Sequence, residues 1–101
     1  MPSVLILEPA QNDLVRLEYF LAEKDHDAAE RMKKAMANAL SRLEESPNIG
    51  SPFRKIFKRL LVRFGKSKYV LVYKYVKTDN MVYVLAVWHG REDPSHPQHG
   101  Q

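Results

Sequence analysis

The hydrophobic residues of this chain change their repeat part-way along the sequence, from a helical spacing to a two-residue alternation. Leucine and alanine recur at three- and four-residue intervals through residues 9 to 45, whereas alternation begins near Lys58 and continues to Trp88. A period near 3.6 buries one face of a helix, and a period of two buries one face of a strand. The pattern therefore predicts helices first and a sheet of consecutive strands after them.

Two helices are expected in the first half, over residues 9 to 23 and residues 27 to 45. Asp27, with Glu30 three positions later, fits a capping box at the start of the second helix. The short connection predicts that the two helices pack as an antiparallel hairpin. The apolar faces are formed in the first helix by Leu14, Leu17, Phe20 and Leu21, and in the second by Ala28, Ala29, Met32, Ala35, Met36, Ala39, Leu40 and Leu43.

Strands are expected on both sides of this helix hairpin. Val4 to Leu7 predicts a short buried strand, and the segment from Ser46 to Pro52 predicts a reversal of the chain. Three further strands are predicted over residues 58 to 64, 69 to 76 and 81 to 88, with a hairpin turn at residues 78 to 80. The last two strands are apolar on both faces, so we expect them to lie centrally.

The predicted fold class is α+β. An N-terminal strand and an antiparallel two-helix hairpin pack on a mainly antiparallel sheet that has a three-stranded C-terminal meander. We expect a single domain over residues 1 to 93 and a flexible tail over residues 94 to 101.

Composition limits the chain to one small core and excludes several classes of protein. With 101 residues, 45% of them hydrophobic and 28% charged, it has the composition of a soluble globular domain. It has no cysteine, which excludes disulfides and thiolate metal sites, and no apolar run approaches the roughly 18 to 20 residues that span a bilayer. The first residues lack the regions of a secretory signal. We therefore expect a cytoplasmic protein.

Positive charge is concentrated between Arg54 and Lys68. Seven of these fifteen residues are Lys or Arg and none is acidic, so the rest of the chain holds nine basic against twelve acidic residues. Because the segment leads into apolar strands, it predicts a cationic rim at one end of the sheet that attracts an anionic partner. The candidate partner-binding residues are Arg59, Arg63, Lys66, Lys68, Trp88, His89 and Arg91.

Two kinds of chemistry are compatible with this rim. In one, the rim cleaves RNA: a histidine moves the proton of a ribose 2′-hydroxyl while arginines stabilise the charge that develops on the phosphate. The catalytic residues in that alternative are Arg63, His89 and Arg91. In the other, the rim only docks on a partner and no residue is catalytic. Residue types alone do not choose between the two.

The remaining histidines and the tyrosines have simpler interpretations. His96 and His99 have a metal-like spacing but no rigid scaffold, and His26 lies between two aspartates at the start of a helix, so we expect no metal site and no cofactor. Tyr69, Tyr73 and Tyr75 lie on one strand face, where they serve either as a stacking platform for bases or as core residues. Core packing is the favoured interpretation for the tyrosines and for Trp88.

Five short motifs follow one another in order over about residues 4 to 93. They are Ala10-Gln-Asn-Asp13-Leu14, Ala28-Ala29, Leu43-Glu-Glu-Ser-Pro47-Asn-Ile-Gly50, Tyr69-Val-Leu-Val-Tyr73 and Val84-Leu-Ala-Val-Trp-His89-Gly90-Arg91-Glu-Asp93. With the predicted order of helices and strands, they resemble the RelE/ParE toxin superfamily of bacterial toxin–antitoxin modules. The resemblance implies the fold described above and the toxin component of a type II, plasmid-stabilising module.

The superfamily holds two activities on one fold. ParE-like members inhibit DNA gyrase and are not known to cut RNA, whereas RelE-like members are ribosome-dependent endoribonucleases that cut mRNA. RelE-type chains carry an arginine directly after the tyrosine that opens the third strand, where this sequence has Val70. They also carry a late aromatic residue, which this sequence lacks after Trp88. The resemblance therefore favours a ParE-like gyrase inhibitor.

The resemblance also implies the partners. We expect a cognate antitoxin, which covers apolar grooves beside the helices and the sheet with an amphipathic helix and an extended segment. We expect DNA gyrase as the target, with the ribosome and mRNA as the alternative, and no membrane and no small-molecule cofactor. A non-toxic interaction protein is a third class, which predicts no growth arrest when the chain is expressed without an antitoxin.

Overall fold

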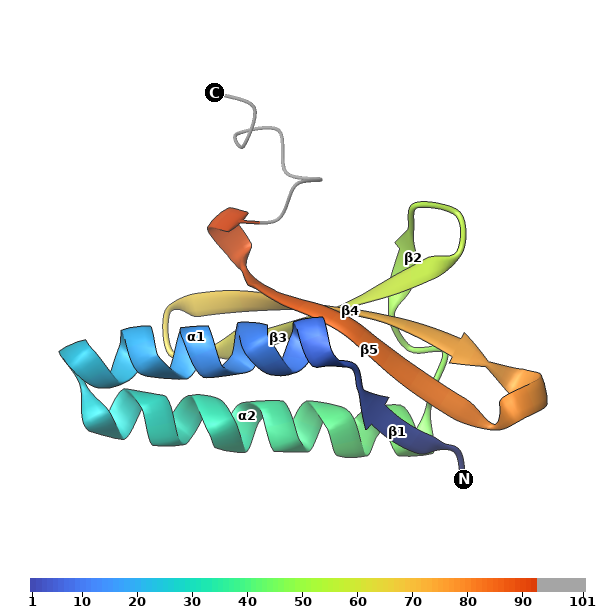
Figure 1. The fold of residues 1–101 in the computed structure, drawn as a ribbon, viewed down its shortest axis with the longest axis horizontal. Coiled ribbons are helices and arrows are strands. Elements are labelled where there is room, and N and C mark those ends of the chain that lie inside the picture. The colour runs from blue at the N-terminus through green and yellow to red at the C-terminus, as the bar shows by residue number, and fades with distance from the viewer. Residues whose placement is uncertain (93–101) are drawn as a thin grey trace.

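The fold is a two-helix hairpin that covers one face of a five-stranded sheet (Figure 1). It was obtained as a computed structural model, in which residues 1–92 are described. The elements are β1 (Ser3–Ile6), α1 (Glu8–Lys24), α2 (His26–Glu45), β2 (Ser51–Phe53), β3 (Phe57–Phe64), β4 (Ser67–Val76) and β5 (Met81–His89), with short 3-10 turns η1 (Lys77–Asp79) and η2 (Gly90–Glu92). The expected tail over residues 94 to 101, with His96 and His99, lies outside the described residues.

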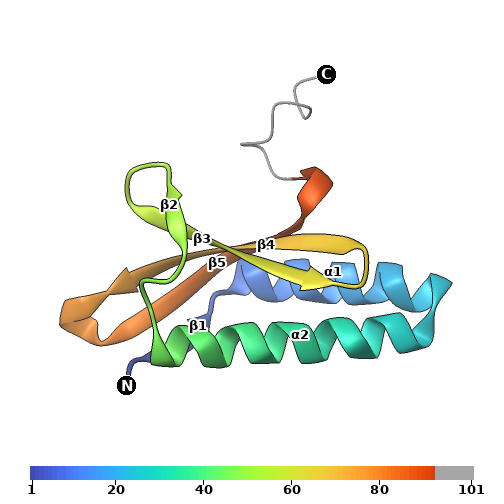
Figure 2. The same ribbon diagram turned by 180° about the vertical axis from the view of Figure 1, so that it is seen from behind.

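The sheet has the strand order β1-β5-β4-β3-β2. β1 pairs with β5 in parallel, and every other pair is antiparallel. The predicted α+β fold, the meander of β3, β4 and β5, and the central position of β4 and β5 are therefore confirmed. Seen from behind, both helices lie along the same side of the sheet (Figure 2). None of the helices in residues 1–92 is both long enough and apolar enough to span a membrane.

The prediction that the first strand is buried is wrong. β1 is an edge strand whose residues alternate between exposed and half-buried, and Leu5 is 46% exposed. The cause is its position, because β1 has a partner only in β5 and only Val4 and Ile6 pack against the core. An apolar tetrapeptide thus contributes only alternate side chains to the interior.

The predicted capping box at Asp27 is also wrong. The N-cap of α2 is Asp25, whose Oδ1 accepts hydrogen bonds from the backbone N–H groups of Asp27 (3.0 Å) and Ala28 (3.3 Å). Asp25 is extended, with φ −161°, and it ends α1 as well as starting α2. Because one residue connects the two helices, the cap falls two positions earlier than the sequence pattern indicated, and Glu30 pairs with Lys33 instead, at 2.9 Å.

The sequence did not predict β2. Ser51 and Pro52 were assigned to a reversal, but Ser51–Phe53 pairs antiparallel with the start of β3. Pro52 fits there because an edge strand leaves half of its N–H groups outside the ladder. Three residues are too few to show an alternation, so the strand left no periodic signal.

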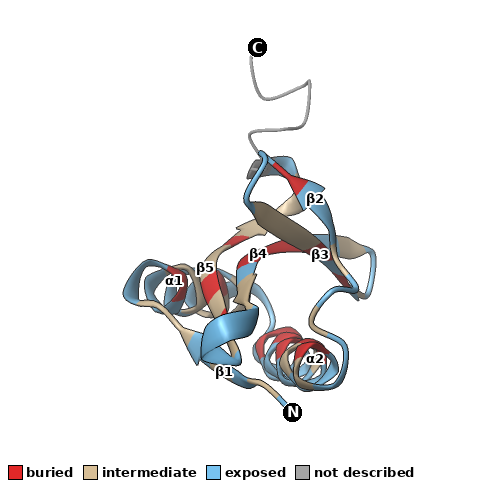
Figure 3. Cartoon of the chain, turned by 90° about the vertical axis from the view of Figure 1, so that its right-hand side faces the viewer, coloured by how far each residue is buried: buried red, intermediate tan, exposed pale blue. Residues whose placement is uncertain are grey.

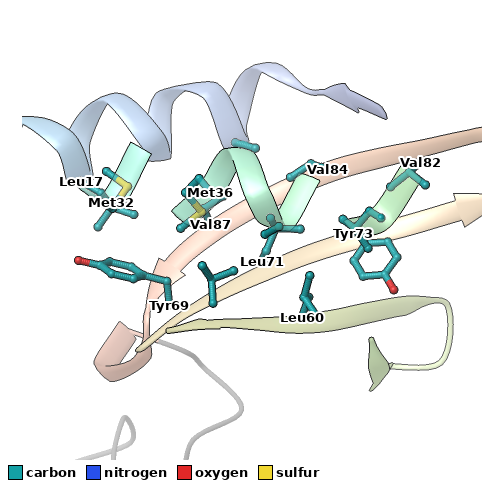
Figure 4. Close-up of a cluster of buried hydrophobic side chains, with 14 residues drawn as sticks. Leu17, Met32, Met36, Leu60, Tyr69, Leu71, Tyr73, Val82, Val84 and Val87 are labelled. Carbon is teal, nitrogen blue, oxygen red and sulfur yellow. The ribbon is translucent and has the colours of Figure 1, made fainter. Parts of the chain in front are cut away.

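The main core lies between the helices and the inner face of the sheet. Buried residues of α2 face the sheet (Figure 3), and Leu17, Met32 and Met36 point toward the strands (Figure 4). Tyr69 and Tyr73 are 2% and 0% exposed, which confirms the core interpretation of these tyrosines. The hydroxyl of Tyr73 accepts a hydrogen bond from the N–H of Gly50 (2.9 Å), and burial raises the pKa of Tyr73.

A β-bulge in β5 decides which face each late residue occupies. Val72 pairs with Ala86 while Tyr73 pairs with Val84, so that Leu85 is the extra residue. Val84 and Val87 consequently both face the main core, whereas Ala86 and Trp88 face the opposite side. We call that opposite side the outer face. It carries a second, smaller cluster formed by Phe53, Val70 and Val72 with Phe57, Ala86 and Trp88 packed against it.

Candidate functional site

The predicted contact residues divide into two groups. Lys66, Lys68, His89 and Arg91 line one open cleft at the end of the sheet. Arg59, Arg63 and Trp88 lie outside this cleft: the alternation in β3 and the bulge in β5 direct them to the outer face. The sequence treated the seven residues as one rim, but only four of them line the cleft. Lys68 lies at the boundary between the groups, because it lines the cleft and also pairs with Arg63 in the β3–β4 ladder.

The cleft has a volume of about 910 Å³ and lies between α1, the β3–β4 turn and the end of β5. Three parts of the chain that are distant in sequence supply its cations, and none of its described lining residues is acidic. The floor is apolar and aromatic. The lining residues are Arg16, Leu17, Phe20, Lys24, Lys66, Ser67, Lys68, Tyr69, His89, Gly90 and Arg91. A concave apolar floor with a cationic border fits an anionic ligand or an acidic segment of a protein.

Sequence reasoning missed the contribution of α1 to this cleft. Phe20 was grouped with the apolar face of the first helix, and Arg16 and Lys24 were not among the predicted contact residues. The three residues are four positions apart, so they lie on one helix face. That face borders the cleft, and the Lys24 ammonium lies 4.5 Å from the centre of the Phe20 ring. The four-residue spacing is visible in the sequence. Only the position of α1 on the sheet shows that this helix face borders the cleft.

Asp13 fixes α1 on the sheet beside the cleft. Its Oδ2 accepts a hydrogen bond from the backbone N–H of Val87 (2.9 Å), which lies past the last paired residue of β1. Its Oδ1 lies 3.8 Å from the Arg16 guanidinium. Asp13 therefore completes the hydrogen bonding of β5 where β1 ends and lies next to one of the cations that line the cleft.

The segment His89-Gly90-Arg91 forms a compact corner at the end of β5. The imidazole of His89 packs edge-on against Tyr69, with ring centres 5.3 Å apart, and its Nδ1 accepts a hydrogen bond from the backbone N–H of Arg91 (3.1 Å). Because Nδ1 is an acceptor, the uncharged ring carries its proton on Nε2. A Cβ on Gly90 would lie 2.9 Å from the carbonyl oxygen of Lys68, so only glycine fits at this position.

The outer face is apolar around Val70. Val70 is 2% exposed and packs in the cluster with Phe53 and Val72. Trp88 contacts Phe53 edge-on, with ring centres 6.0 Å apart. Farther along the same face, Arg63 lies directly opposite Lys68 in the β3–β4 ladder. The predicted role of Trp88 as a residue that packs at a strand end agrees with this geometry.

The described residues contain no group of three or more metal-ligating side chains. His26 is the first residue of α2 and is exposed, next to the capping residue Asp25. His96 and His99 lie outside the described residues. The cleft holds one imidazole, His89, among cations, and cations repel a metal ion.

Comparison with known proteins identifies relatives along almost the whole chain. Residues 4–94 match the family described as "ParE toxin of type II toxin-antitoxin system, parDE". The chain is also similar to Toxin RelE1 of Caulobacter vibrioides, with 33% identity over 90 residues that cover 89% of this chain and 95% of that protein.

Solved structures with the same fold include free and complexed toxins. The E. coli toxin RelE, as a mutant in the free state, has a TM-score of 0.62 and 22% identity, and the match covers 91% of this chain and 86% of that one. The RelBE2 toxin–antitoxin complex of Mycobacterium tuberculosis contains a chain with a TM-score of 0.60 and 24% identity, matched over 88% of this chain and 99% of that one. At these identities the likeness establishes the fold.

Proposed function

We propose that this chain, which belongs to the ParE toxin family of type II toxin–antitoxin systems, stops growth by binding DNA gyrase and not by cutting RNA. The contact surface comprises the four cleft residues Lys66, Lys68, His89 and Arg91. Arg59, Arg63 and Trp88 on the outer face extend this surface around the end of the sheet. Binding stabilises the state of gyrase in which the DNA ends stay cleaved.

The burial of Val70 is the observation that carries this proposal. RelE-type chains have an arginine at the corresponding position, after the tyrosine that opens the third strand. Here the side chain is 2% exposed within an apolar cluster, so position 70 itself offers no cation to a reacting phosphate. A preorganised donor of that kind typically lowers a transition state by about 3 kcal/mol.

The geometry of His89 supports the same conclusion. A general base needs an unprotonated ring nitrogen directed at the substrate. Nδ1 of His89 already accepts the Arg91 N–H, and the proton of the uncharged ring is on Nε2. In this arrangement the uncharged imidazole has no nitrogen lone pair left to act as a base, which suits recognition of a partner and not proton abstraction.

The antitoxin belongs to the proposal as well. Relatives of this fold are known in toxin–antitoxin complexes from E. coli and M. tuberculosis. We propose that a cognate antitoxin covers α1, where Val15, Tyr19 and Phe20 are 66%, 73% and 52% exposed. An amphipathic helix with acidic flanks fits this surface, because exposed apolar residues lie next to the cations of the cleft.

Induction of the chain in a growing bacterium tests the proposal, with gyrase-linked DNA breakage and mRNA integrity as the two readouts. We expect broken DNA and intact mRNA. The double variant Lys66→Ala/Arg91→Ala should bind purified gyrase about tenfold more weakly, since truncating a central contact residue commonly costs more than 1 kcal/mol. Lys34→Ala, on the exposed side of α2, is the control and should bind like the parent chain.

The second candidate function is mRNA cleavage, and the cation-bordered cleft around His89 favours it. It predicts cut transcripts during induction and loss of cutting in His89→Ala and Arg91→Ala. Arg63, the third member of that catalytic set, does not line the cleft. Cut mRNA without DNA breakage would replace the gyrase proposal, and induction without any growth arrest would indicate a non-toxic interaction protein.

A further inference from the structure

We propose that the β2–β3 hairpin binds the phosphate backbone of duplex DNA. This inference goes beyond docking on gyrase, because it assigns a nucleic-acid contact to the tip of the hairpin, which is not among the proposed gyrase contacts. Arg59, at the base of the hairpin, is the one residue that belongs to both surfaces. The hairpin projects from the side of the sheet that faces away from the helices (Figures 1 and 3). Its tip is formed by Arg54, Lys55 and Ile56, all of which are exposed.

The charge of the hairpin has one sign. Residues 51–59 contain four cations, Arg54, Lys55, Lys58 and Arg59, and no acidic residue. Outside residues 54–68 the chain has more acidic than basic residues, so this charge is local. Clustered Lys and Arg without carboxylates are the usual composition of a phosphate-binding surface.

The backbone conformation at the tip of the hairpin is unusual for residues as large as arginine and lysine. Arg54 and Lys55 both have left-handed conformations, with φ 51° and 54°. Glycine adopts this conformation without strain, whereas residues with a Cβ do so at a cost. Two consecutive long basic side chains are therefore unfavourable for the turn itself. The cost of this conformation points to a role for the two side chains beyond the turn.

The arginines of the hairpin are held in place by an aromatic ring. The guanidinium carbons of Arg54 and Arg59 lie 5.1 Å and 5.4 Å from the centre of the Phe53 ring. Phe53 is 7% exposed and is anchored edge-on against Trp88. For Arg54, at the exposed tip, stacking on the ring orders the guanidinium without using its N–H groups, so binding of a phosphate requires little further ordering.

The shape of the hairpin favours duplex DNA over an acidic protein surface. A two-stranded ribbon fits the major groove of B-DNA, where the phosphates of both strands flank it. The proposed contacts are to phosphate oxygens, which carry no sequence information. An acidic protein surface would instead present carboxylates at fixed positions together with neutral hydrogen-bonding groups. This hairpin has few neutral polar side chains that could pair with such groups.

The test measures binding of the purified chain to a fluorescent 20-base-pair duplex by anisotropy over a range of salt concentrations. The variant Arg54→Gly/Lys55→Gly removes two cations and suits the backbone conformation, so it should fold at least as well as the parent chain. Each lost phosphate contact reduces the slope of log binding constant against log salt concentration by about 0.9. For two lost contacts we expect this slope to be smaller by about 1.8 and the affinity to be weaker by at least about tenfold. The matched control, Lys34→Gln/Arg42→Gln on α2, removes the same charge and should change neither value.

Three outcomes would overturn the inference. They are an unchanged slope in the hairpin variant, an equal loss in the α2 control, and equally tight binding of polyglutamate of similar charge. A gyrase pull-down without DNA keeps this result separate from the proposed function. The hairpin variant should still bind gyrase, whereas Lys66→Ala/Arg91→Ala should bind gyrase about tenfold more weakly and keep most of its affinity for DNA.

Discussion

At the scale of single residues, Val70 shows how packing on the outer face limits where a charge can lie. The side chain of Val70 is enclosed by the small cluster on the outer face. Its partner directly across the ladder, Leu61, is on the same face but 44% exposed. Two neighbouring apolar positions therefore differ in whether they can accept a charge.

Substitution of this pair by arginine tests the difference. Val70→Arg should lower the free energy of unfolding by about 3 kcal/mol or more, because it places an unpaired charge in an apolar cluster. Leu61→Arg should change it by no more than about 0.5 kcal/mol, as is usual for exposed positions. Urea denaturation of both variants gives the comparison. Equal stability of the two would mean that position 70 can carry an exposed arginine after all.

At the scale of elements, the connection between the helices shows how a cap is chosen. The spacing of Asp27 and Glu30 satisfies the sequence rule for a capping box, yet the chain uses Asp25. The reason is geometric, because the antiparallel hairpin leaves a single extended residue between α1 and α2. The Lys33 ammonium also joins the two helices, since it contacts Glu18 of α1 (3.2 Å) as well as Glu30.

Removal of each aspartate distinguishes the two caps. Asp25→Ala should cost about 1 kcal/mol of unfolding free energy, the usual value for a lost N-cap. Asp27→Ala removes only a favourable charge in the first turn and should cost about half as much or less. Thermal unfolding followed by circular dichroism measures both. A larger effect at Asp27 would restore the capping box that the sequence predicted.

At the scale of the whole molecule, stability should fall in alkaline solution. The hydroxyl of Tyr73 is buried beneath the loop that contains Gly50, and burial raises the pKa of Tyr73 above the ordinary value near 10. A raised pKa means that the folded state holds the proton more tightly. The contribution of the protonated Tyr73 hydroxyl to the free energy of unfolding is therefore fully present below about pH 10. It is lost as the pH rises through the pKa of Tyr73 in the folded state.

Unfolding experiments between pH 8 and 11.5 check this expectation. The slope of unfolding free energy above about pH 10 should be smaller in Tyr73→Phe than in the parent chain. The pKa of Tyr83 is also raised, mainly by its hydrogen bond to the Asp79 carboxylate, but Tyr83 is partly exposed. Tyr83→Phe is therefore the control and should retain most of the slope. An identical slope in all three chains would contradict the assignment to Tyr73.

Some features of the whole fold could be predicted from the sequence, and others could not. Periodicity predicted both helices and the meander, because each of these elements buries a regular stripe of residues. It did not predict the face of Trp88 or His89, since residues 81–88 are apolar on both sides and a bulge leaves no mark in such a run. It also did not predict the cleft, because Arg16, Lys68 and Arg91 meet only after α1 is docked across β5.

The extra residue in β5 has an evolutionary consequence. In a regular strand Val84 and His89, five positions apart, would face opposite sides, whereas here both face the helices because Leu85 is not counted in the alternation. A descendant that lost the Leu85 codon would keep the same side chains on the same faces. Alignments of related genes should therefore permit a one-codon gap at this point, and equivalent positions should be counted from each end of the strand separately.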